Sequence, residues 1–570
     1  MNPAQLLIHF DRISEAPNAI PRLRRFIRDL AVRGKLVEQD PKDESASELL
    51  KRIHAEKVRL VKNASIRKQE PTPQVEIEDQ PFDLPTNWQW VRFGAIADFS
   101  AGRTPSRHDF SFWNTGDYPW VSIADMRDGG VVVTTKETVS PKAKNQVFRS
   151  EPVPVGTLIM SFKLTIGKIS RLGVPAFHNE AIISIHPHLP AMDDYFFEVL
   201  PQLSRQGDTK DAIKGATLNR DSIANILLPL PPLAEQQRII AKVDELMALC
   251  DRLEASQAER ESQRDRLAAA SLNRLNNGTD LDAFRDHAHF YFNHLPRLTM
   301  RPEHIQKLRQ TILNLAVHGK LVPQDPNDES ASELLKRIEL TRGRLLAERK
   351  IPKPKDLPAL EDIELPFSAP AGWEWTFLGK LCFQVSDGPH YSPQYVSPDS
   401  GVPFLSTRNV RADRFDLNDL KYVSKEDHER FCKRIRPEQG DILYTKGGTT
   451  GIARVNDLDF EFSVWVHLAV LRVAKEFLAP QYVALALNSA LCYDQSQAYT
   501  QGISNFDLGL TRMIKIVIPF PPLAEQQHIV AKVDELMALC DRLEAQLTIT
   551  QTESGRLLEA VLHEALAPAM

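Results

Sequence analysis

One stretch occurs twice in this chain, as AVRGKLVEQDPKDESASELLKRI at residues 31–53 and as AVHGKLVPQDPNDESASELLKRI at residues 316–338. The two copies agree at 20 of 23 positions, with an offset of 285. A second stretch, PLPPLAEQQRIIAKVDELMALCDRLEA at residues 229–255, returns at residues 519–545 with 24 of 27 positions unchanged and an offset of 290. Repeats of this length indicate that two whole modules follow one another along the chain.

The segments between these repeats differ almost completely. They share a Trp-x-Trp motif near their start, at Trp88 and Trp90 and again at Trp373 and Trp375. Constant ends with variable middles favour a common scaffold that carries two different recognition domains. Unselected sequence drift of the middles after a duplication is the alternative, but drift alone would also have changed the repeated ends of the modules.

The first constant region contains an apolar helical stripe ahead of Gly34, which ends the helix. The stripe consists of Leu23, Phe26, Ile27, Leu30 and Ala31. The patterns Ser45-x-x-Glu48 and Ser330-x-x-Glu333 then fit a capping box, which begins a second helix in each copy. The second helices are predicted to end near Arg67 and Arg349, before proline-rich linkers.

A long helix is predicted after the paired prolines of each second repeat, since proline is tolerated in a first turn. Its apolar residues step by four and three, as in a coiled-coil seam. The seam residues are Ile239, Val243, Leu246, Cys250 and Leu253 in the first copy and Ile529, Val533, Leu536, Cys540, Leu543 and Leu547 in the second. Two such seams favour an antiparallel pair of helices of about 35 residues and about 50 Å that holds the domains apart. Packing of each helix on its own domain is the alternative.

Both middles contain short β-type runs broken by Gly, Pro and Asn. The runs cover residues 131–135, 156–162 and 181–185 in the first module and 441–445, 463–473 and 514–518 in the second. The predicted class is α+β, with mainly antiparallel strands: two globular recognition domains of mixed α/β structure alternate with two long, repeated, coiled-coil-like helical spacers in a pseudo-two-fold tandem repeat.

The predicted domains follow from these limits. They are an N-terminal helical region (1–85), a first recognition domain (86–228), a central helical spacer (229–365), a second recognition domain (366–518) and a C-terminal helical spacer (519–570).

Two loops that follow strands, at residues 163–168 and 446–451, combine Lys, Thr and Gly. Their amides and cations could meet phosphates or base edges, although neither loop has the order of a Walker A motif. The candidate DNA-binding residues are Arg103, Lys163, Thr165, Lys168, Lys214 and Asn219 in the first module and Arg408, Asn409, Lys446, Thr449 and Asn505 in the second. For any one of them, a solvated surface position is the alternative.

Three pairs of short motifs are predicted to occupy matching positions of one fold. They are Gly102-Arg-Thr-Pro with Asp387-Gly-Pro, Pro119-Trp-Val with Pro403-Phe-Leu, and Asp125-Met with Arg408-Asn-Val.

The formal charge of −5 argues against binding of nucleic acid through bulk electrostatics. Residues 101–220 hold 14 Lys and Arg against 12 Asp and Glu, and residues 381–520 hold 15 against 16. Any DNA-facing surface must therefore be local. The five cysteines lack C-x-x-C spacing, so reduced and mostly buried thiols are expected.

Catalytic motifs are not apparent in the sequence. The Pro-Pro pairs lack the polar first residue of the (Asp/Asn)-Pro-Pro-aromatic motif of amino-methylating enzymes, and no His, Asp and Glu cluster has metal spacing. Only a permissive nuclease pattern occurs, with Asp399 followed by Asp419-Leu-Lys421. The start lacks the features of a signal peptide and no apolar run spans a bilayer, so a cytoplasmic protein is expected.

Taken along the chain, these motifs resemble the specificity subunit of type I restriction-modification systems. The resemblance includes the Gly-Lys-Leu-Val and Leu-Leu-Lys-Arg-Ile motifs, Trp-x-Trp, Gly-Arg-Thr-Pro, Thr-Ile-Gly-Lys, and the duplicated Pro-Leu-Ala-Glu-Gln-Gln that opens each long helix. It covers nearly the whole chain, although the second module has Asp387-Gly-Pro-His in place of the Gly-x-Thr-Pro motif.

The resemblance implies that each middle is a target recognition domain that reads one half of an asymmetric, interrupted site in double-stranded DNA. The repeated helices would set the half-site spacing and dock two methyltransferase subunits, which bind S-adenosylmethionine and methylate adenine N6. Restriction subunits that use ATP and Mg²⁺ would join them, and this chain would bind no cofactor. Half-sites centred about 10 base pairs apart are expected. A two-headed protein-interaction scaffold and a self-contained nuclease are the alternatives.

Overall fold

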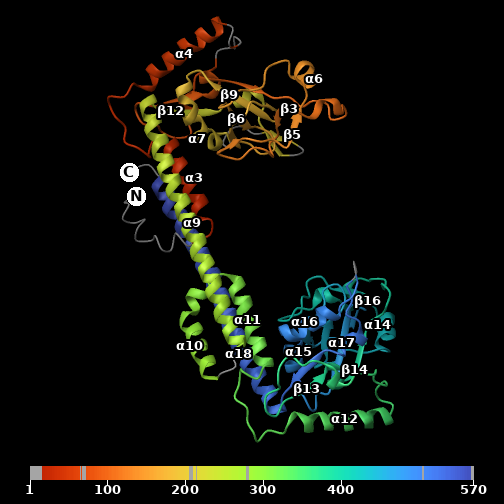
Figure 1. The fold of residues 1–570 in the computed structure, drawn as a ribbon. Coiled ribbons are helices and arrows are strands. Elements are labelled where there is room, and N and C mark those ends of the chain that lie inside the picture. Colours follow the sequence, from red (N-terminus) through yellow and green to blue (C-terminus); the bar gives the residue numbers. More distant parts are fainter. Residues whose placement is uncertain are drawn as a thin grey trace. The chain divides into compact units, whose positions relative to one another are not determined.

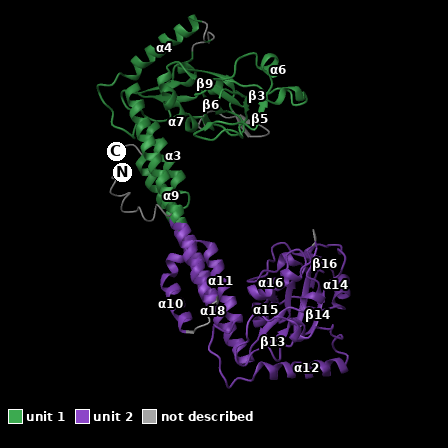
Figure 2. Ribbon diagram, viewed as in Figure 1, with its two compact units in different colours: residues 1–259, 551–570 green, residues 260–550 purple. Residues whose placement is uncertain are grey.

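A computed structural model describes residues 16–63, 66, 72–204, 210–212, 215–277, 281–502 and 506–566 (Figure 1). The chain forms two compact units, one of residues 1–259 with 551–570 and the other of residues 260–550 (Figure 2). Two long helices, α9 (Leu233–Asn277) and α18 (Leu523–Leu566), each contribute residues to both units.

Unit 1 contains the first mixed α/β domain. Its helices are α3 (Ala19–Val32), α4 (Ala46–Lys62), α5 (Phe93–Ile96), α6 (Pro141–Ala143), α7 (Asp193–Leu203) and α8 (Arg220–Ala224). Its strands are β1 (Gln89–Arg92), β2 (Ala97–Ala101), β3 (Trp113–Val121), β4 (Gly130–Val132), β5 (Glu137–Val139), β6 (Leu158–Ser161), β7 (Ile169–Leu172), β8 (Phe177–His178), β9 (Ile182–Pro187), β10 (Lys210–Ala212), β11 (Gly215–Thr217) and β12 (Leu227–Leu230). The main sheet has the order β2-β9-β6-β7-β4, beside a β5-β3-β8 sheet and the pairs β1-β12 and β10-β11.

Unit 2 contains the second domain. Its helices are α10 (Leu281–Leu298), α11 (Pro302–Val317), α12 (Ala331–Ala347), α13 (Leu378–Leu381), α14 (Lys425–Cys432), α15 (Pro480–Asn488), α16 (Ala490–Tyr499) and α17 (Leu510–Met513). Its strands are β13 (Glu374–Phe377), β14 (Cys382–Asp387), β15 (Gly401–Leu405), β16 (Lys421–Ser424), β17 (Ile442–Thr445), β18 (Ala453–Val455), β19 (Ser463–Val464), β20 (Leu468–Val473) and β21 (Val517–Phe520). They form sheets of order β14-β20-β17-β18, β16-β15-β19 and β13-β21.

Both domains are mainly antiparallel, as the sequence predicts, and the α+β class is confirmed. The parallel pairs are β3 with β8, β4 with β7 and β15 with β19. The run predicted at residues 463–473 is divided between β19 and β20. The capping prediction holds at Ser45, whose hydroxyl accepts from the Glu48 amide, whereas the Ser330 hydroxyl pairs with that of Ser332.

The two seams do not pack on each other, so that part of the prediction is wrong. The predicted pairing of the two long helices is nevertheless present in unit 2, where Leu272 and Leu275 of α9 lie in one core with the second seam. The first seam lies in a core with Ile20, Leu23 and Ile27 of α3, which runs beside α9 (Figure 1). The second seam lies in a different core, which includes Ile305 and Ile312 of α11. Each copy carries its own amphipathic helix, which covers the apolar seam of its long helix and removes it from water.

This packing also corrects the expected docking residues. Ile239, Val243, Ile529 and Val533 are at most 5% exposed, so a partner cannot reach these side chains. The remaining predicted docking residues are half-buried at the edges of the same two cores; they are Leu246, Leu253, Leu536 and Leu543. The seams therefore hold each copy of the scaffold together.

The ends of each recognition domain are neighbours. Strand β1 pairs antiparallel with β12, from Gln89 opposite Leu230, and β13 pairs with β21 in the same register, from Glu374 opposite Phe520. Each domain is thus inserted into the scaffold through one two-stranded ladder.

A buried polar cluster ties that ladder to the start of each long helix. In the second copy Glu525 accepts a hydrogen bond of 2.8 Å from the Trp373 indole, and the Gln526 amide donates to the Pro521 carbonyl. The Tyr482 hydroxyl donates to the carbonyl of Pro519 in β21. The first copy repeats all three contacts through Trp88–Glu235, Gln236–Pro231 and Tyr195–Pro229. The duplicated Ala-Glu-Gln-Gln motif is therefore a joint between domain and helix.

Glu525 gives this joint a pH dependence. Its side chain is 2% exposed, one carboxyl oxygen has no hydrogen-bond partner, and burial raises its pKa to about 7. In the first copy Glu235 receives a second hydrogen bond, from the Gln39 amide. The buried carboxyl group thus accepts side-chain hydrogen bonds from two residues in the first joint and from one residue in the second.

We expect the stability of the wild-type chain to fall as pH rises from about 4.5 to about 7 and to level off above that, because over this range the folded state holds the Glu525 proton and the unfolded state does not. A shift from an ordinary value of 4.5 corresponds to roughly 3 kcal/mol at pH 8. The Glu525→Gln variant should lose this slope and be the more stable protein above pH 7. Urea unfolding followed by tryptophan fluorescence from pH 5 to 8 measures it.

The matched variant Glu235→Gln should change the slope less, because Glu235 accepts two hydrogen bonds. A pH profile that is the same in wild type and Glu525→Gln would contradict the assignment.

The remaining sequence expectations concern cysteines and membrane spans. Cys250, Cys382, Cys492 and Cys540 are buried free thiols, and Cys432 is half-buried. Within the described ranges, no helix has the length and apolar character to cross a membrane.

Candidate nucleic-acid interface

The β6–β7 loop (loop A, residues 162–168) and the β17–β18 loop (loop B, residues 446–452) have the same backbone structure. The Gly167 amide donates to the Ser161 carbonyl and the Gly451 amide to the Thr445 carbonyl, each at 2.9 Å. Both loops have positive φ at their third residue and at their penultimate glycine. The offset between equivalent positions is therefore 284, one residue different from the alignment of Lys163 with Lys446.

Loop A presents two of its predicted residues to solvent. Thr165 is exposed, and the half-buried Lys163 places its ammonium 5.3 Å from the centre of the Phe162 ring. Lys168 instead donates to the Ile123 carbonyl at 3.0 Å, so its ammonium is held against the domain. The tip of loop A is the part available to a ligand.

Lys446 does not face solvent. Its equivalent in loop A is the buried Phe162, and the side chain of Lys446 is itself only 5% exposed. Its ammonium lies 3.1 Å from an Asp507 oxygen and 3.4 Å from an Asp387 oxygen. A buried ammonium requires such counter-ions. Lys446 is therefore not available to read a base edge, contrary to the prediction. Thr449, at the exposed tip of loop B, remains available.

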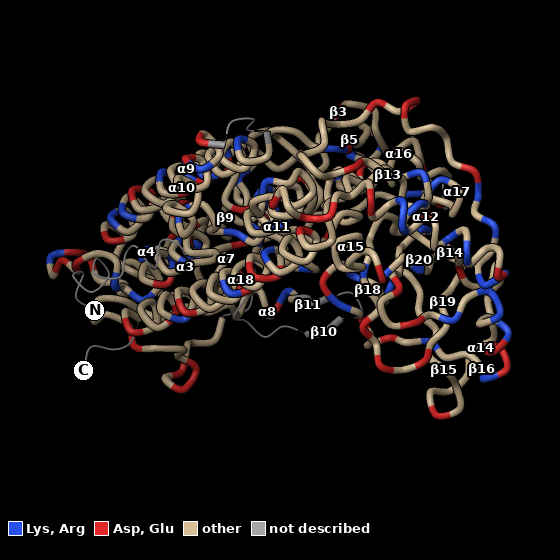
Figure 3. Tube along the Cα trace, turned by 90° about the horizontal axis from the view of Figure 1, so that it is seen from below, with Lys and Arg blue, Asp and Glu red and all other residues tan. Residues whose placement is uncertain are grey.

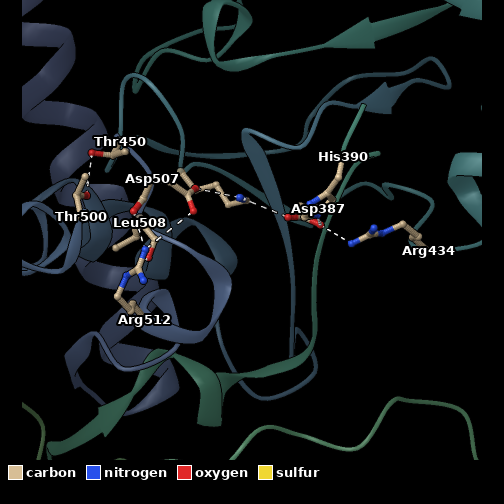
Figure 4. Close-up of polar contacts among 9 residues, drawn as sticks. Asp387, His390, Arg434, Thr450, Thr500, Asp507, Leu508 and Arg512 are labelled. Carbon is tan, nitrogen blue, oxygen red and sulfur yellow. Dashed lines mark hydrogen bonds and ion pairs between the residues drawn. The ribbon is translucent and has the colours of Figure 1, made fainter. Parts of the chain in front are cut away.

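Asp387 is the centre of an ionic network that surrounds Lys446 (Figure 4). Its carboxylate, 3% exposed, also receives the Arg434 guanidinium at 2.6 Å and the His390 ring at 3.3 Å. The guanidinium of Arg512 donates to the Asp507 carbonyl at 2.8 Å. These contacts fix loop B against the end of β14 and the segment that precedes α17. The sequence signal was the aspartate of the Asp387-Gly-Pro motif, whose role as the counter-ion of Lys446 the sequence did not indicate.

Gly102 and Gly388 occupy equivalent positions after β2 and β14. A Cβ on Gly102 would lie 1.9 Å from the His178 carbonyl oxygen, and one on Gly388 would lie 1.7 Å from that of Val464. Both carbonyls belong to the short parallel strands, β8 and β19. The predicted correspondence of the Gly-Arg-Thr-Pro and Asp-Gly-Pro segments is therefore confirmed.

Arg103 follows the first of these glycines and is exposed. Its guanidinium donates to the Val147 carbonyl at 2.6 Å. It lines a cavity of about 630 Å³ together with Arg220 and His178. This cavity also contains Asp98 and Glu151, so its charge is mixed.

Two predicted asparagines serve the fold instead of a ligand. Asn219 caps α8 by accepting from the Ser222 amide at 2.7 Å. Asn409, 4% exposed, accepts from the Ser406 amide and donates to the Asp416 carbonyl, each at 2.9 Å. Its side chain is buried and bonded within the domain, so Asn409 is not available to read bases as predicted.

The matching residue in the first domain is Asp125, which accepts from the Ser122 amide in the same geometry. Arg408 is exposed and contacts no charged group among the described residues. It therefore remains a candidate. Lys214 and Asn505 lie outside the described residues.

An exposed cation outside the predicted set, Arg127, also lies near loop A. Arg127 is in a segment whose Gly129 amide donates to the Ile169 carbonyl, directly after the loop. Its guanidinium forms no ion pair within the described part of the domain. Figure 3 shows Lys and Arg positions interspersed with Asp and Glu positions along the backbone trace.

The permissive nuclease pattern does not form a site. Asp399 precedes β15 and Asp419 precedes β16, and these strands are antiparallel, so the two carboxylates lie at opposite ends of one hairpin. Asp419 pairs with Lys421 at 3.4 Å. In the described ranges, no group of three His, Cys, Asp or Glu residues could hold a metal ion.

The chain has two α+β domains, each inserted into one copy of a duplicated helical scaffold. The two domains have equivalent loops with different loop side chains. This arrangement defines a recognition protein with two recognition domains. The chain matches the family of the type I restriction modification DNA specificity domain twice, at residues 85–261 and 371–550. It is 30% identical to the specificity subunit of the type I restriction enzyme EcoEI of Escherichia coli, over 96% of this chain and 94% of that one. It is 29% identical to the EcoAI subunit of the same species, with the same coverage.

A solved HsdS subunit from Thermoanaerobacter tengcongensis aligns with a TM-score of 0.42 and 19% identity, over 85% of this chain and 98% of that one. The chain belongs to the type I restriction-modification DNA specificity family. It is a specificity subunit with two recognition domains.

Proposed function

We propose that each recognition domain reads one half of an asymmetric, two-part site in double-stranded DNA, and that this chain catalyses no reaction. Loops A and B carry the proposal, because they share one backbone structure and differ at five of their seven positions, Thr165 and Gly167 being kept as Thr449 and Gly451. Leu164 occupies the position of Gly448, and Phe162 that of Lys446. Equivalent loops with different side chains can read different sequences from the same kind of surface.

The spacer helices are proposed to dock two methyltransferase subunits and to set the half-site spacing. Their buried seams are needed for folding, but several exposed positions near the start of each helix are also identical in both copies. The exposed identical pairs are Gln237 and Gln527, Ala241 and Ala531, Asp244 and Asp534, Glu245 and Glu535, and Ala248 and Ala538. Packing within the chain does not require identity at solvent-facing positions, so a partner that meets both faces is the physical reason we favour.

Cofactors belong to those partners in this proposal. S-adenosylmethionine would bind the methyltransferase subunits, which methylate adenine N6, and ATP and Mg²⁺ would bind restriction subunits. The residues described in this chain do not fit a magnesium site, since Asp399 and Asp419 diverge and no other acidic cluster is assembled. We therefore place none of these groups on the specificity subunit.

An exchange of domains tests the assignment of half-sites. Replacing residues 89–230 by residues 374–520 joins the chain at equivalent positions of the β1–β12 and β13–β21 ladders. The scaffold helices that cover the domains present the same residues to each, Leu49 and Ile53 in α4 and Leu334 and Ile338 in α12. We expect a folded protein that directs methylation to a site containing the second half-sequence twice.

The measurement is sequencing of methylated adenines in DNA modified by the chain together with its methyltransferase subunit. The reciprocal replacement should give a site that contains the first half-sequence twice. An exchanged protein that still directs methylation to the original asymmetric site would refute the assignment of one half-site to each domain.

A further inference from the structure

Leu164, at the tip of loop A, adopts a backbone conformation that disfavours leucine. Its φ is +65°, in the left-handed region, where the Cβ of an L-residue meets the following carbonyl at a cost of about 1–2 kcal/mol. Loop B has Gly448 at the equivalent position, with φ +73°. Glycine adopts this conformation freely, so the second domain avoids the strain that the first retains.

Packing within the chain does not compensate for this strain. The Leu164 side chain is 60% exposed and belongs to none of the apolar cores formed by the described residues. It is also an apolar group in water, which is a second unfavourable term. A strained and exposed residue of this kind indicates a functional role, because no apolar core formed by the described residues compensates for the strain.

The neighbours of Leu164 are suited to a nucleic acid. Thr165 is exposed, Lys163 is half-buried, and the segment that bonds to the end of the loop carries the exposed Arg127. Cationic and hydroxyl groups contact phosphates and base edges, while an apolar side chain between them can contact the 5-methyl group of thymine in the major groove. Thymine alone among the four bases presents such a methyl group there.

We propose that Leu164 is a specificity-determining residue, which selects thymine in the half-site read by the first domain through contact with its 5-methyl group. The proposal rests on the proposed function, in which loop A faces DNA. Loop B cannot make the same contact through Gly448, because glycine has no side chain. The two half-sites are therefore read by different chemistry at equivalent loop positions.

Deoxyuridine isolates the methyl group, since it keeps every Watson–Crick and groove hydrogen bond of thymine. Duplexes carry the site identified by methylation sequencing, with each thymine of either strand replaced in turn by deoxyuridine. For the wild-type chain with its methyltransferase subunit, one replacement in the first half-site should weaken binding by about tenfold, the usual effect of one methyl group in a close apolar contact. The Leu164→Gly variant should bind the two duplexes equally.

Two further variants keep the test independent of folding. Leu164→Asn retains a side chain at a position whose φ asparagine tolerates, and should also lose the distinction between thymine and uracil. Phe110→Ala removes an apolar side chain that is 84% exposed elsewhere in the domain, and should preserve the distinction. Urea unfolding should find Leu164→Gly at least as stable as wild type.

Retention of the full thymine preference by Leu164→Gly overturns the proposal, as does a first half-site made only of G·C pairs. If the exchange of residues 89–230 changes the first half-site while Leu164→Gly changes nothing, then only this inference fails. If the exchange itself leaves the site unchanged, the proposed function fails first.

Discussion

A Gly388→Ala variant is expected to lose recognition by the second domain while the first domain keeps its fold. The added Cβ would lie 1.7 Å from the carbonyl oxygen of Val464 and 2.6 Å from its carbonyl carbon, both backbone atoms. The parallel pairing of Leu405 with Val464 must open to admit it. Overpacking against a fixed backbone costs about 3 kcal/mol or more, which is a large share of the stability of one domain.

Hydrogen exchange measured peptide by peptide should show loss of protection in β15 and β19, with β3 and β8 unchanged. Gly343→Ala is the matched control, because a Cβ there meets nothing within 4 Å in the middle of α12. It should stabilise the protein by about 0.5–1 kcal/mol. Normal protection of β15 in Gly388→Ala would show that the added Cβ is accommodated without opening the strands, and would contradict this prediction.

Replacing Lys446 by phenylalanine is expected to destabilise the second domain by about 3–5 kcal/mol. Phenylalanine is the residue at the equivalent position of loop A, Phe162, so a side chain of this shape suits the fold. The change, however, leaves the carboxylate of Asp387 buried with fewer counter-ions. Free energies of unfolding from urea titration measure the loss.

The double variant Lys446→Phe with Asp387→Ala installs the pair found in the first domain, Phe162 and Ala101. It should recover most of the lost stability, because both buried charges are then absent. Lys421→Met removes an exposed lysine paired with Asp419 and should change the free energy by less than about 0.5 kcal/mol. A double variant no more stable than the single one would contradict the role of Asp387.

The scaffold could be predicted from sequence because its signals are local and repeated. The apolar stripe of α3 and the seam of α9 were both visible, as were the starts of α4, α9, α12 and α18. What the pattern could not show is which apolar surface meets which. An apolar seam does not identify the surface that covers it, and the 14-residue helix α3 in the same copy covers the seam that we had assigned to the other long helix.

The recognition loops show a different limit. Lys163 and Lys446 stand one position apart in equivalent loops, and successive residues after a strand point to opposite sides. That single step puts one ammonium at the surface and the other in an ionic network inside the domain. Asn409 illustrates the same limit, since a buried cap and an exposed reader have the same sequence letter. Spatial partners decide such cases, and these partners are distant in sequence.

The two-stranded ladders at the base of each domain have a consequence for inheritance. Gln89 lies opposite Leu230, and Glu374 lies opposite Phe520. The chain therefore enters and leaves each recognition domain at the same place on the scaffold. Recombination within the gene segments that encode the repeated scaffold would replace a whole recognition domain and keep both joints intact. The domain could thereby be exchanged in one genetic event, with no compensating mutation in the scaffold.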